Sequence, residues 1–250
     1  MRASSALLAA LAAAQVGYGR LPGRRGPAST RGLVGLMLAT SAAEAVQARG
    51  LRRGALPVAA AGALGFAAEL AGVATGRPFG RYHYSGQLGP RVGGVPLLAA
   101  AAWAMMARPA WVVAGLLTRR STARIPVAAG ALTAWDVFLD PRMAREGYWT
   151  WPEGGHYEGV PASNFLGWWL TGLGVFAVWS RLDGDDHPAV DGDGALALYA
   201  WTWAGETFAN ALLWRRPRVA AAGAAAMGAF AAPALWQRVR AALGTTSGAA

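Results

Sequence analysis

The chain has 250 residues, of which 54% are hydrophobic and 14% charged, and its mean hydropathy is +0.28. Its apolar residues come in blocks of about 20, separated by arginine-rich links, which predicts a polytopic helical membrane protein and excludes an ordinary soluble domain. The net charge of +10 comes from arginine alone and lies mostly in the links, where it favours contact with anionic lipid headgroups over nucleic-acid binding. Because there is no cysteine, disulfides, thiolate metal ligands and cysteine nucleophiles are excluded.

We expect an all-α, polytopic transmembrane bundle of seven to eight helices, forming one integral membrane domain over residues 1–250. A bacterial inner membrane is its expected location, with the lipid bilayer as its first partner. The apolar segments predicted to form the helices are, in chain order, 5–19, 32–48, 55–75, 93–118, 126–140, 162–180, 195–214 and 217–236.

Two of these segments have an alternative. Segment 5–19 has the length of a signal peptide, but more membrane sequence follows it, so we favour a first transmembrane helix. Segment 93–118 is interrupted by Arg108 and Pro109, and proline disfavours helix at the residue before it. This segment is therefore either one long tilted span or a pair of half-helices.

The links differ in character. Links 76–92 and 141–161 are rich in Gly, Trp and Tyr, and they share one face of the membrane if 93–118 is a single span. The Asp-rich link 181–194 holds five aspartates and is interpreted as a solvated loop; it lacks the terminal Glu of an EF-hand, which disfavours calcium binding. Residues 244–250 are predicted to be a disordered tail.

Two carboxylates fall inside one apolar segment. Asp136 and Asp140 are four residues apart and therefore lie on one helix face. Exposure of this pair to lipid would be very unfavourable, so we expect both to point into the bundle, where an apolar cavity favours the protonated form of a proton donor. The alternative for Asp140 is a helix cap before Pro141 or an ion pair with Arg142.

Three further acids stand alone in apolar segments, namely Glu44, Glu69 and Glu206. An acid inside the membrane is by default a candidate functional group, and Glu69 lies deepest. The alternative is an ion pair with an arginine, which suits Glu44 because Arg49 follows five residues later. Glu206 forms a second one-turn polar pair with Asn210.

The aromatic residues and the histidines carry weaker signals. The usual explanation of Trp and Tyr in links is anchoring at the membrane interface, although ring faces near a site can contact a polyene or stabilise a carbocation. His83 and His156 lie in the two aromatic links. No HxxxH or ExxH spacing accompanies them, so we predict no metal site.

Three stretches together carry a resemblance to a known family. They are PFGRYHYSGQLGPRVGGVPLL (78–98), AWDVFLDPRMAREGYWTW (134–151) and GVPASNFLGWWLTG (159–172). In this order they resemble the CruF-type carotenoid hydratases, a family of integral membrane proteins usually labelled as carotenoid biosynthesis proteins. The family-like core covers residues 76–172.

The resemblance implies a lyase of the hydratase type that needs no cofactor. Its substrate would be an acyclic carotenoid, such as a lycopene-type or longer polyene, and other carotenoid enzymes are conceivable partners. The reaction adds water across the terminal isoprenoid double bond and gives a tertiary alcohol. Such a hydration needs a strong proton donor, a pocket that tolerates a tertiary cation, and one positioned water.

The residues supply candidates for each requirement. The catalytic candidates are Asp136, Asp140 and Glu69. The candidates for substrate binding are Tyr82, Tyr84, Trp135, Tyr148, Trp149, Trp151, Ser163, Asn164 and Trp168. Ser163 and Asn164 would hold the water, and capping of their helix is the equally open alternative. The alternative hypotheses are a prenyl transferase or cyclase that acts on the same end group, and a non-catalytic carotenoid carrier or transporter.

Overall fold

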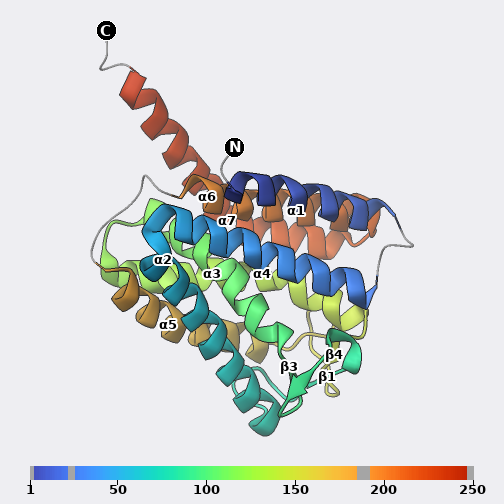
Figure 1. Ribbon diagram of the computed structural model, residues 1–250. Coiled ribbons are helices and arrows are strands. Elements are labelled where there is room, and N and C mark those ends of the chain that lie inside the picture. The colour runs from blue at the N-terminus through green and yellow to red at the C-terminus, as the bar shows by residue number, and fades with distance from the viewer. Residues whose placement is uncertain (1–2, 22–25, 185–191, 247–250) are drawn as a thin grey trace.

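The computed structural model describes residues 3–21, 26–184 and 192–246. In this part of the chain seven α-helices form a bundle (Figure 1). They are α1 (Ala3–Arg20), α2 (Pro27–Thr75), α3 (Leu98–Leu117), α4 (Ser121–Arg145), α5 (Ala162–Asp183), α6 (Asp193–Phe208) and α7 (Pro217–Thr246). A π-helical turn, Ala209–Leu213, extends α6. The prediction of an all-α bundle is confirmed.

Helix α2 consists of two helices joined at a kink. Gly50 has φ 76° and ψ 168°, a backbone conformation outside the helical region that glycine adopts without a side-chain penalty. The two halves match the predicted segments 32–48 and 55–75, so each of the eight predicted segments contains helix. Among the described residues, three helices are long and apolar enough to cross a membrane: Pro27–Thr75, Leu98–Leu117 and Pro217–Leu243. The number of spans stays a prediction.

Helix α3 lies at the centre of the bundle. It packs against α2, α4, α6 and α7, and every residue from Trp103 to Ala114 is buried. Arg108 and Pro109 lie within this one continuous helix, which decides between the two alternatives for 93–118. A hairpin of β2 (Arg91–Val92) and β3 (Val95–Pro96) precedes it.

The two aromatic links meet at one end of the bundle. Strand β1 (His83–Tyr84) pairs antiparallel with β4 (Trp149–Thr150), and Tyr84 stands opposite Trp149. The backbone N–H of Ser85 also donates to the carbonyl of Tyr148 at 2.8 Å. Figure 1 shows the strands gathered beyond the first turn of α3. The links therefore share one end of the bundle, as predicted for a single helix over 93–118.

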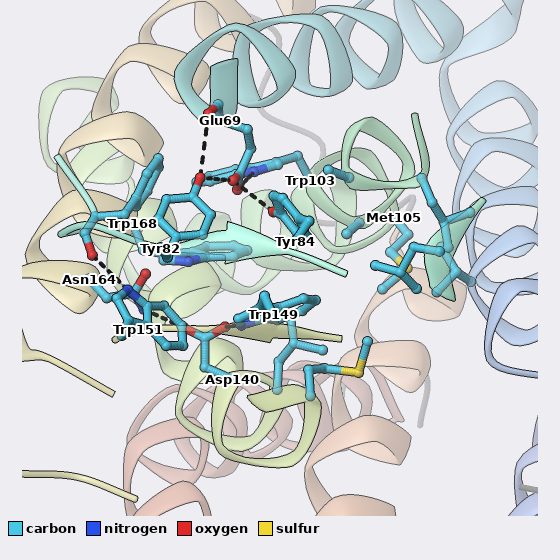
Figure 2. Close-up of a pocket in the computed structure, with 18 residues that line it drawn as sticks. Glu69, Tyr82, Tyr84, Trp103, Met105, Asp140, Trp149, Trp151, Asn164 and Trp168 are labelled. Carbon is cyan, nitrogen blue, oxygen red and sulfur yellow. Dashed lines mark hydrogen bonds between the residues drawn. The ribbon is translucent and has the colours of Figure 1, made fainter. Parts of the chain in front are cut away.

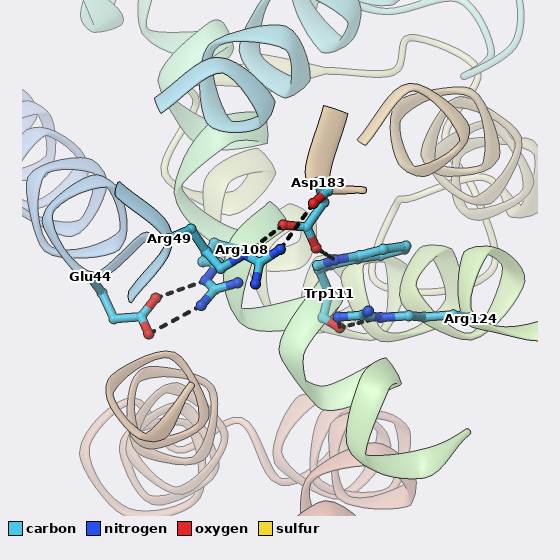
Figure 3. Close-up of polar contacts among 6 residues, drawn as sticks. All are labelled: Glu44, Arg49, Arg108, Trp111, Arg124 and Asp183. Atoms are coloured by element: carbon cyan, nitrogen blue, oxygen red, sulfur yellow. Dashed lines mark hydrogen bonds and ion pairs between the residues drawn. The ribbon is translucent and has the colours of Figure 1, made fainter. Parts of the chain in front are cut away.

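The opposite end contains a buried ion cluster (Figure 3). We define it as Glu44, Arg49, Arg108, Arg124 and Asp183. Arg108 donates to Glu44 at 2.9 Å, and Arg49 donates to Asp183 at 3.0 Å. Trp111 donates its indole N–H to Asp183 at 2.8 Å. Glu44 thus pairs across the bundle with Arg108, and not with its sequence neighbour Arg49.

The start of the Asp-rich link is not part of the solvated loop that we predicted. Asp183 closes α5 and is only 1% exposed, because it accepts hydrogen bonds in the ion cluster. Asp193 opens α6 and pairs with Arg238 of α7 at 2.6 Å. Residues 185–191, with the remaining aspartates, lie outside the described residues. Residues 247–250 of the predicted tail also lie outside the described residues, whereas residues 244–246 belong to α7 and are not the disordered tail that we predicted.

Candidate active site

The strand end of the bundle encloses a cavity, which we call the acid cavity (Figure 2). Its lining comes from α2, α3, α4, α5 and both aromatic links. The lining residues are Val34, Glu69, Phe79, Tyr82, Tyr84, Leu88, Leu98, Ala99, Ala102, Trp103, Met105, Leu139, Asp140, Met143, Trp149, Trp151, Asn164 and Trp168. The free volume is about 50 Å³. One buried water needs about 10–15 Å³, so the cavity has room for a few water molecules.

Glu69 forms one wall and receives three hydrogen bonds. The hydroxyls of Tyr82 and Tyr84 both donate to its Oε2, Tyr84 at 2.8 Å. The indole N–H of Trp103 donates to Oε1 at 3.0 Å. Burial, and after it the charge of Glu69, raises the pKa of the Tyr82 hydroxyl well above its usual value, so this hydroxyl remains a donor. Three donors around one carboxyl group stabilise its ionised form.

Two glycines of α2 allow this close approach. A Cβ on Gly72 would lie 2.7 Å from the ring of Phe79 and 2.9 Å from the hydroxyl of Tyr82. A Cβ on Gly65 would overlap the side chain of Trp103. The missing side chains let the aromatic residues of α3 and the first link lie directly against the backbone of α2, beside Glu69.

The opposite wall is built around Asp140. The amide Nδ2 of Asn164 donates to Asp136 Oδ2 at 2.9 Å and also to Asp140 Oδ2. The indole N–H of Trp149 donates to Asp140 Oδ1 at 3.1 Å. Asp136 and Asp140 are 0% and 2% exposed. Both therefore point into the bundle from one face of α4, as their spacing predicts, and neither caps a helix end or pairs with Arg142.

Aromatic rings fill the space between the two acid walls. The rings of Trp103 and Trp168 are stacked, with centroids 4.0 Å apart and an interplanar angle of 14°. Trp135 packs edge-on against Trp168 at 6.0 Å. Tyr82 lies 5.9 Å from Trp151. The indole N–H groups of Trp103, Trp149 and Trp151 are all bound to acceptors, so ring faces are what remain for a ligand.

Most of the residues predicted from sequence converge here. Those that line the acid cavity are Glu69, Asp140, Tyr82, Tyr84, Trp149, Trp151, Asn164 and Trp168. Asp136 and Trp135 stand directly behind the lining. Tyr148 lies elsewhere, with its hydroxyl bound to Thr30 at 2.8 Å, and Ser163 is exposed. Asn164 contacts the acids and makes no cap, because α5 has no side-chain cap bond.

Trp103 is not among the site residues predicted from the sequence. It belongs to α3, 34 residues after Glu69, and no local pattern links the two. The signal that could have found it is the requirement that a buried carboxylate obtain donors from neighbouring helices. Trp103 carries one of the few N–H groups that the side chains of α3 offer.

The other predicted polar groups lie apart from the acid cavity. Glu206 accepts from Asn210 at 3.3 Å, as the one-turn spacing predicts, and it lies 3.6 Å from Arg142 beside a second cavity of about 330 Å³. His83 hydrogen-bonds Thr150 at 3.0 Å. Within the described residues, no three His, Cys, Asp or Glu side chains are grouped to hold a metal ion. That the candidate site works without a metal ion remains a prediction.

Comparison with known proteins identifies the family. The family model described as "Carotenoid biosynthesis protein" matches residues 31–230, which include all of the acid cavity. The chain belongs to this family. A curated relative from Haloarcula japonica, named bisanhydrobacterioruberin hydratase, is 31% identical over 126 residues.

That alignment covers 48% of this chain and 43% of the relative, so the chain spans less than half the length of this carotenoid protein. No solved structure matches the chain. The family match and the relative together confirm the resemblance to CruF-type carotenoid hydratases that the three sequence stretches indicated.

Proposed function

We propose that this protein is a membrane-embedded hydratase that adds water to the terminal double bond of an acyclic carotenoid. The observation that carries the proposal is the arrangement of Glu69 and Asp140 on opposite sides of one aromatic cavity (Figure 2). Membership of a carotenoid biosynthesis family supports it, as does the hydratase name of the Haloarcula japonica relative.

The reaction consists of two bond-forming steps and consumes no oxidant or reductant. The electron pair of the terminal double bond takes a proton onto its CH carbon, which leaves a tertiary cation on the neighbouring carbon. Water then bonds to that carbon through an oxygen lone pair, and the resulting oxonium loses one proton to a base. The site must supply an acid, a base and a surface that tolerates the cation.

We assign the acid to the Asp136–Asp140 pair. Both carboxyl groups are buried and both accept from the same amide nitrogen of Asn164, and two carboxyl groups held this close in an apolar site disfavour a second negative charge, so one of them keeps its proton. Among the described residues, Asp136 Oδ1 is buried without a hydrogen-bond partner, a position that favours a neutral group over a carboxylate. Asp140 lines the cavity, so it presents the proton to the substrate while Asp136 stands behind it.

We assign the base to Glu69. Its three donors offset part of the cost of burying a carboxylate, and the carboxylate is the form that can accept a proton from the attacking water. The carboxylate also places a negative charge across the cavity from the acid, and this charge stabilises a cation that forms between the two walls. Acid and base therefore act from opposite sides of the same double bond.

The aromatic rings supply the surface for the cation. Trp103 and Trp168 line the cavity and cover one face of each other by stacking, so their outer faces are the ones that can attract a cation, within about 6 Å of the ring centroid. The present free volume takes water but is too small for an isoprenoid end, so the lining side chains must move apart when the polyene binds.

Expression in a lycopene-producing bacterium tests the proposal. Pigments are extracted and analysed by mass, and a gain of one water per reacted end is the expected result. The matched control is the Asp140→Asn/Glu69→Gln double variant, which keeps side-chain size and should leave the pigment unhydrated. An unchanged pigment profile with the wild-type chain would overturn the proposal. A prenylated or cyclised product would instead identify one of the other end-group reactions.

A further inference from the structure

A cleft, separate from the cavity beside Glu206, lies against the acid cavity at the end of α2. It is a cleft of about 240 Å³, and we call it the polar cleft. Its lining residues are Val73, Ala74, Thr75, Gly76, Arg81, Tyr82, His83 and Pro152. Ala74, Thr75, Arg81 and His83 are exposed, so the cleft opens to the outside of the bundle and not to its interior.

Tyr82 separates the two spaces. Among the described residues it is the one that lines both the acid cavity and the polar cleft. The side chain is 7% exposed and its ring lies between Phe79, at 6.1 Å, and Trp151, at 5.9 Å. The side chain of Tyr82 thus stands between the polar cleft and Glu69.

The hydroxyl of Tyr82 holds the ring in this position. It donates to Glu69 Oε2, and it occupies space that a side chain on Gly72 would fill. A hydrogen bond to a carboxylate is about twice as strong as one to a neutral acceptor. The bond is therefore strongest while Glu69 is ionised and weakens once Glu69 has accepted a proton.

We infer that the polar cleft is the water-access site of the enzyme and that Tyr82 is the positioning residue that closes it. This rests on the proposed function, in which Glu69 takes a proton from the attacking water. The neutral Glu69 then holds Tyr82 less tightly, and water from the cleft reaches the cavity. That water takes the proton from Glu69, the Asp136–Asp140 pair regains a proton through the same water, and the next substrate water is in place.

The absence of cysteine in the sequence allows a direct test of access. Ala102→Cys places one thiol in the lining of the acid cavity, on the α3 side. The probe is the silver ion, which is about as small as water and travels through water but not through lipid. The protein is held in lipid vesicles, and unreacted thiol is titrated after unfolding at successive times.

Ala74→Trp fills the cleft from the last turn of α2, and it should slow the silver reaction of Ala102→Cys by at least about tenfold. Gly86→Trp is the matched control, because Gly86 is exposed, has open space around it and does not line the cleft. It should leave the rate unchanged. Tyr82→Phe keeps the ring but loses the bond to Glu69, and it should speed the reaction by about tenfold. Equal rates in all four proteins would overturn the inference.

A second arm measures turnover in one protein preparation. Ala74→Cys is coupled to a bulky thiol through a disulfide, and hydration should fall by about tenfold and return after reduction. Gly86→Cys, treated in the same way, should keep its activity. Full activity with the cleft blocked overturns the water route. A third outcome is that the silver rates respond as expected but the protein hydrates no carotenoid. This result overturns the proposed function, and the cleft is still the route by which water reaches the cavity.

Discussion

Glu69→Gln replaces the assigned base by an amide of nearly the same size. The amide oxygen still accepts the indole N–H of Trp103, but the amide nitrogen replaces the oxygen that accepts from Tyr82 and Tyr84, so the change affects two hydrogen bonds, each worth roughly 1–3 kcal/mol. The amide cannot take a proton from water. A positioned general base contributes about 10²–10⁴ in rate, so we expect turnover to fall by that factor, equivalent to about 2.7–5.4 kcal/mol in activation free energy.

The assay uses purified protein and an acyclic carotenoid, with hydrated product separated by chromatography and identified by mass. Thermal unfolding of the same preparations checks that the fold survives. Glu206→Gln is the matched control, since Glu206 is another acid in an apolar helix but lies beside the second cavity. Its turnover should equal that of the wild type. Equal losses in the two variants, or full activity of Glu69→Gln, would refute the assignment of Glu69.

Three further predictions follow from the same contacts. Asn164→Leu removes the donor shared by Asp136 and Asp140, and kinetic measurements should show at least about a tenfold loss of turnover; wild-type turnover would contradict this. Arg108→Met leaves Glu44 charged and buried, so the free energy of unfolding measured in detergent should fall by about 3–5 kcal/mol. The double variant Arg108→Met/Glu44→Gln should recover most of this loss. Equal stabilities of the single and the double variant would contradict the ion pair. Burial, followed by the charge of Glu158, raises the pKa of Tyr157 from 10.0 to about 12. Its contribution to stability is therefore complete below pH 10 and lost as the pH rises through 12, and Tyr157→Phe should flatten this part of the stability–pH curve.

The helices and the paired acids could be predicted because local spacing determines them. Apolar blocks mark the helices, and the four-residue spacing of Asp136 and Asp140 places both carboxyl groups on one helix face whatever the rest of the chain does. Glu69 could be predicted as a site residue because a lone acid in an apolar membrane helix is costly and is therefore a functional candidate by default. Its partners were not all found, since Trp103 meets it only when α2 and α3 pack together.

The sequence also did not show which of two neighbouring side chains in one element points into the site. Ser163 and Asn164 are neighbours at the start of α5, but successive residues point about 100° apart around a helix. Only Asn164 faces the acids. Tyr148 and Trp149 are neighbours at β4, where successive side chains point to opposite sides. Trp149 faces the acid cavity and Tyr148 faces Thr30 of α2. Which of two neighbours faces the site depends on the packing of distant helices.

The ion pair between Arg108 and Glu44 also bears on how the chain is made. An arginine in a membrane helix costs about 2.5–3.5 kcal/mol at the bilayer centre on insertion scales, and less toward the bilayer surface, and Arg108 brings this cost to α3 when α3 enters the bilayer without a partner. Glu44 lies on the preceding helix, α2, and is synthesised first. Because Glu44 lies before the kink at Gly50, a gain from this pair requires that both halves of α2 and α3 enter the bilayer together. The same charge pair that closes one end of the finished bundle would thus order the first steps of its assembly.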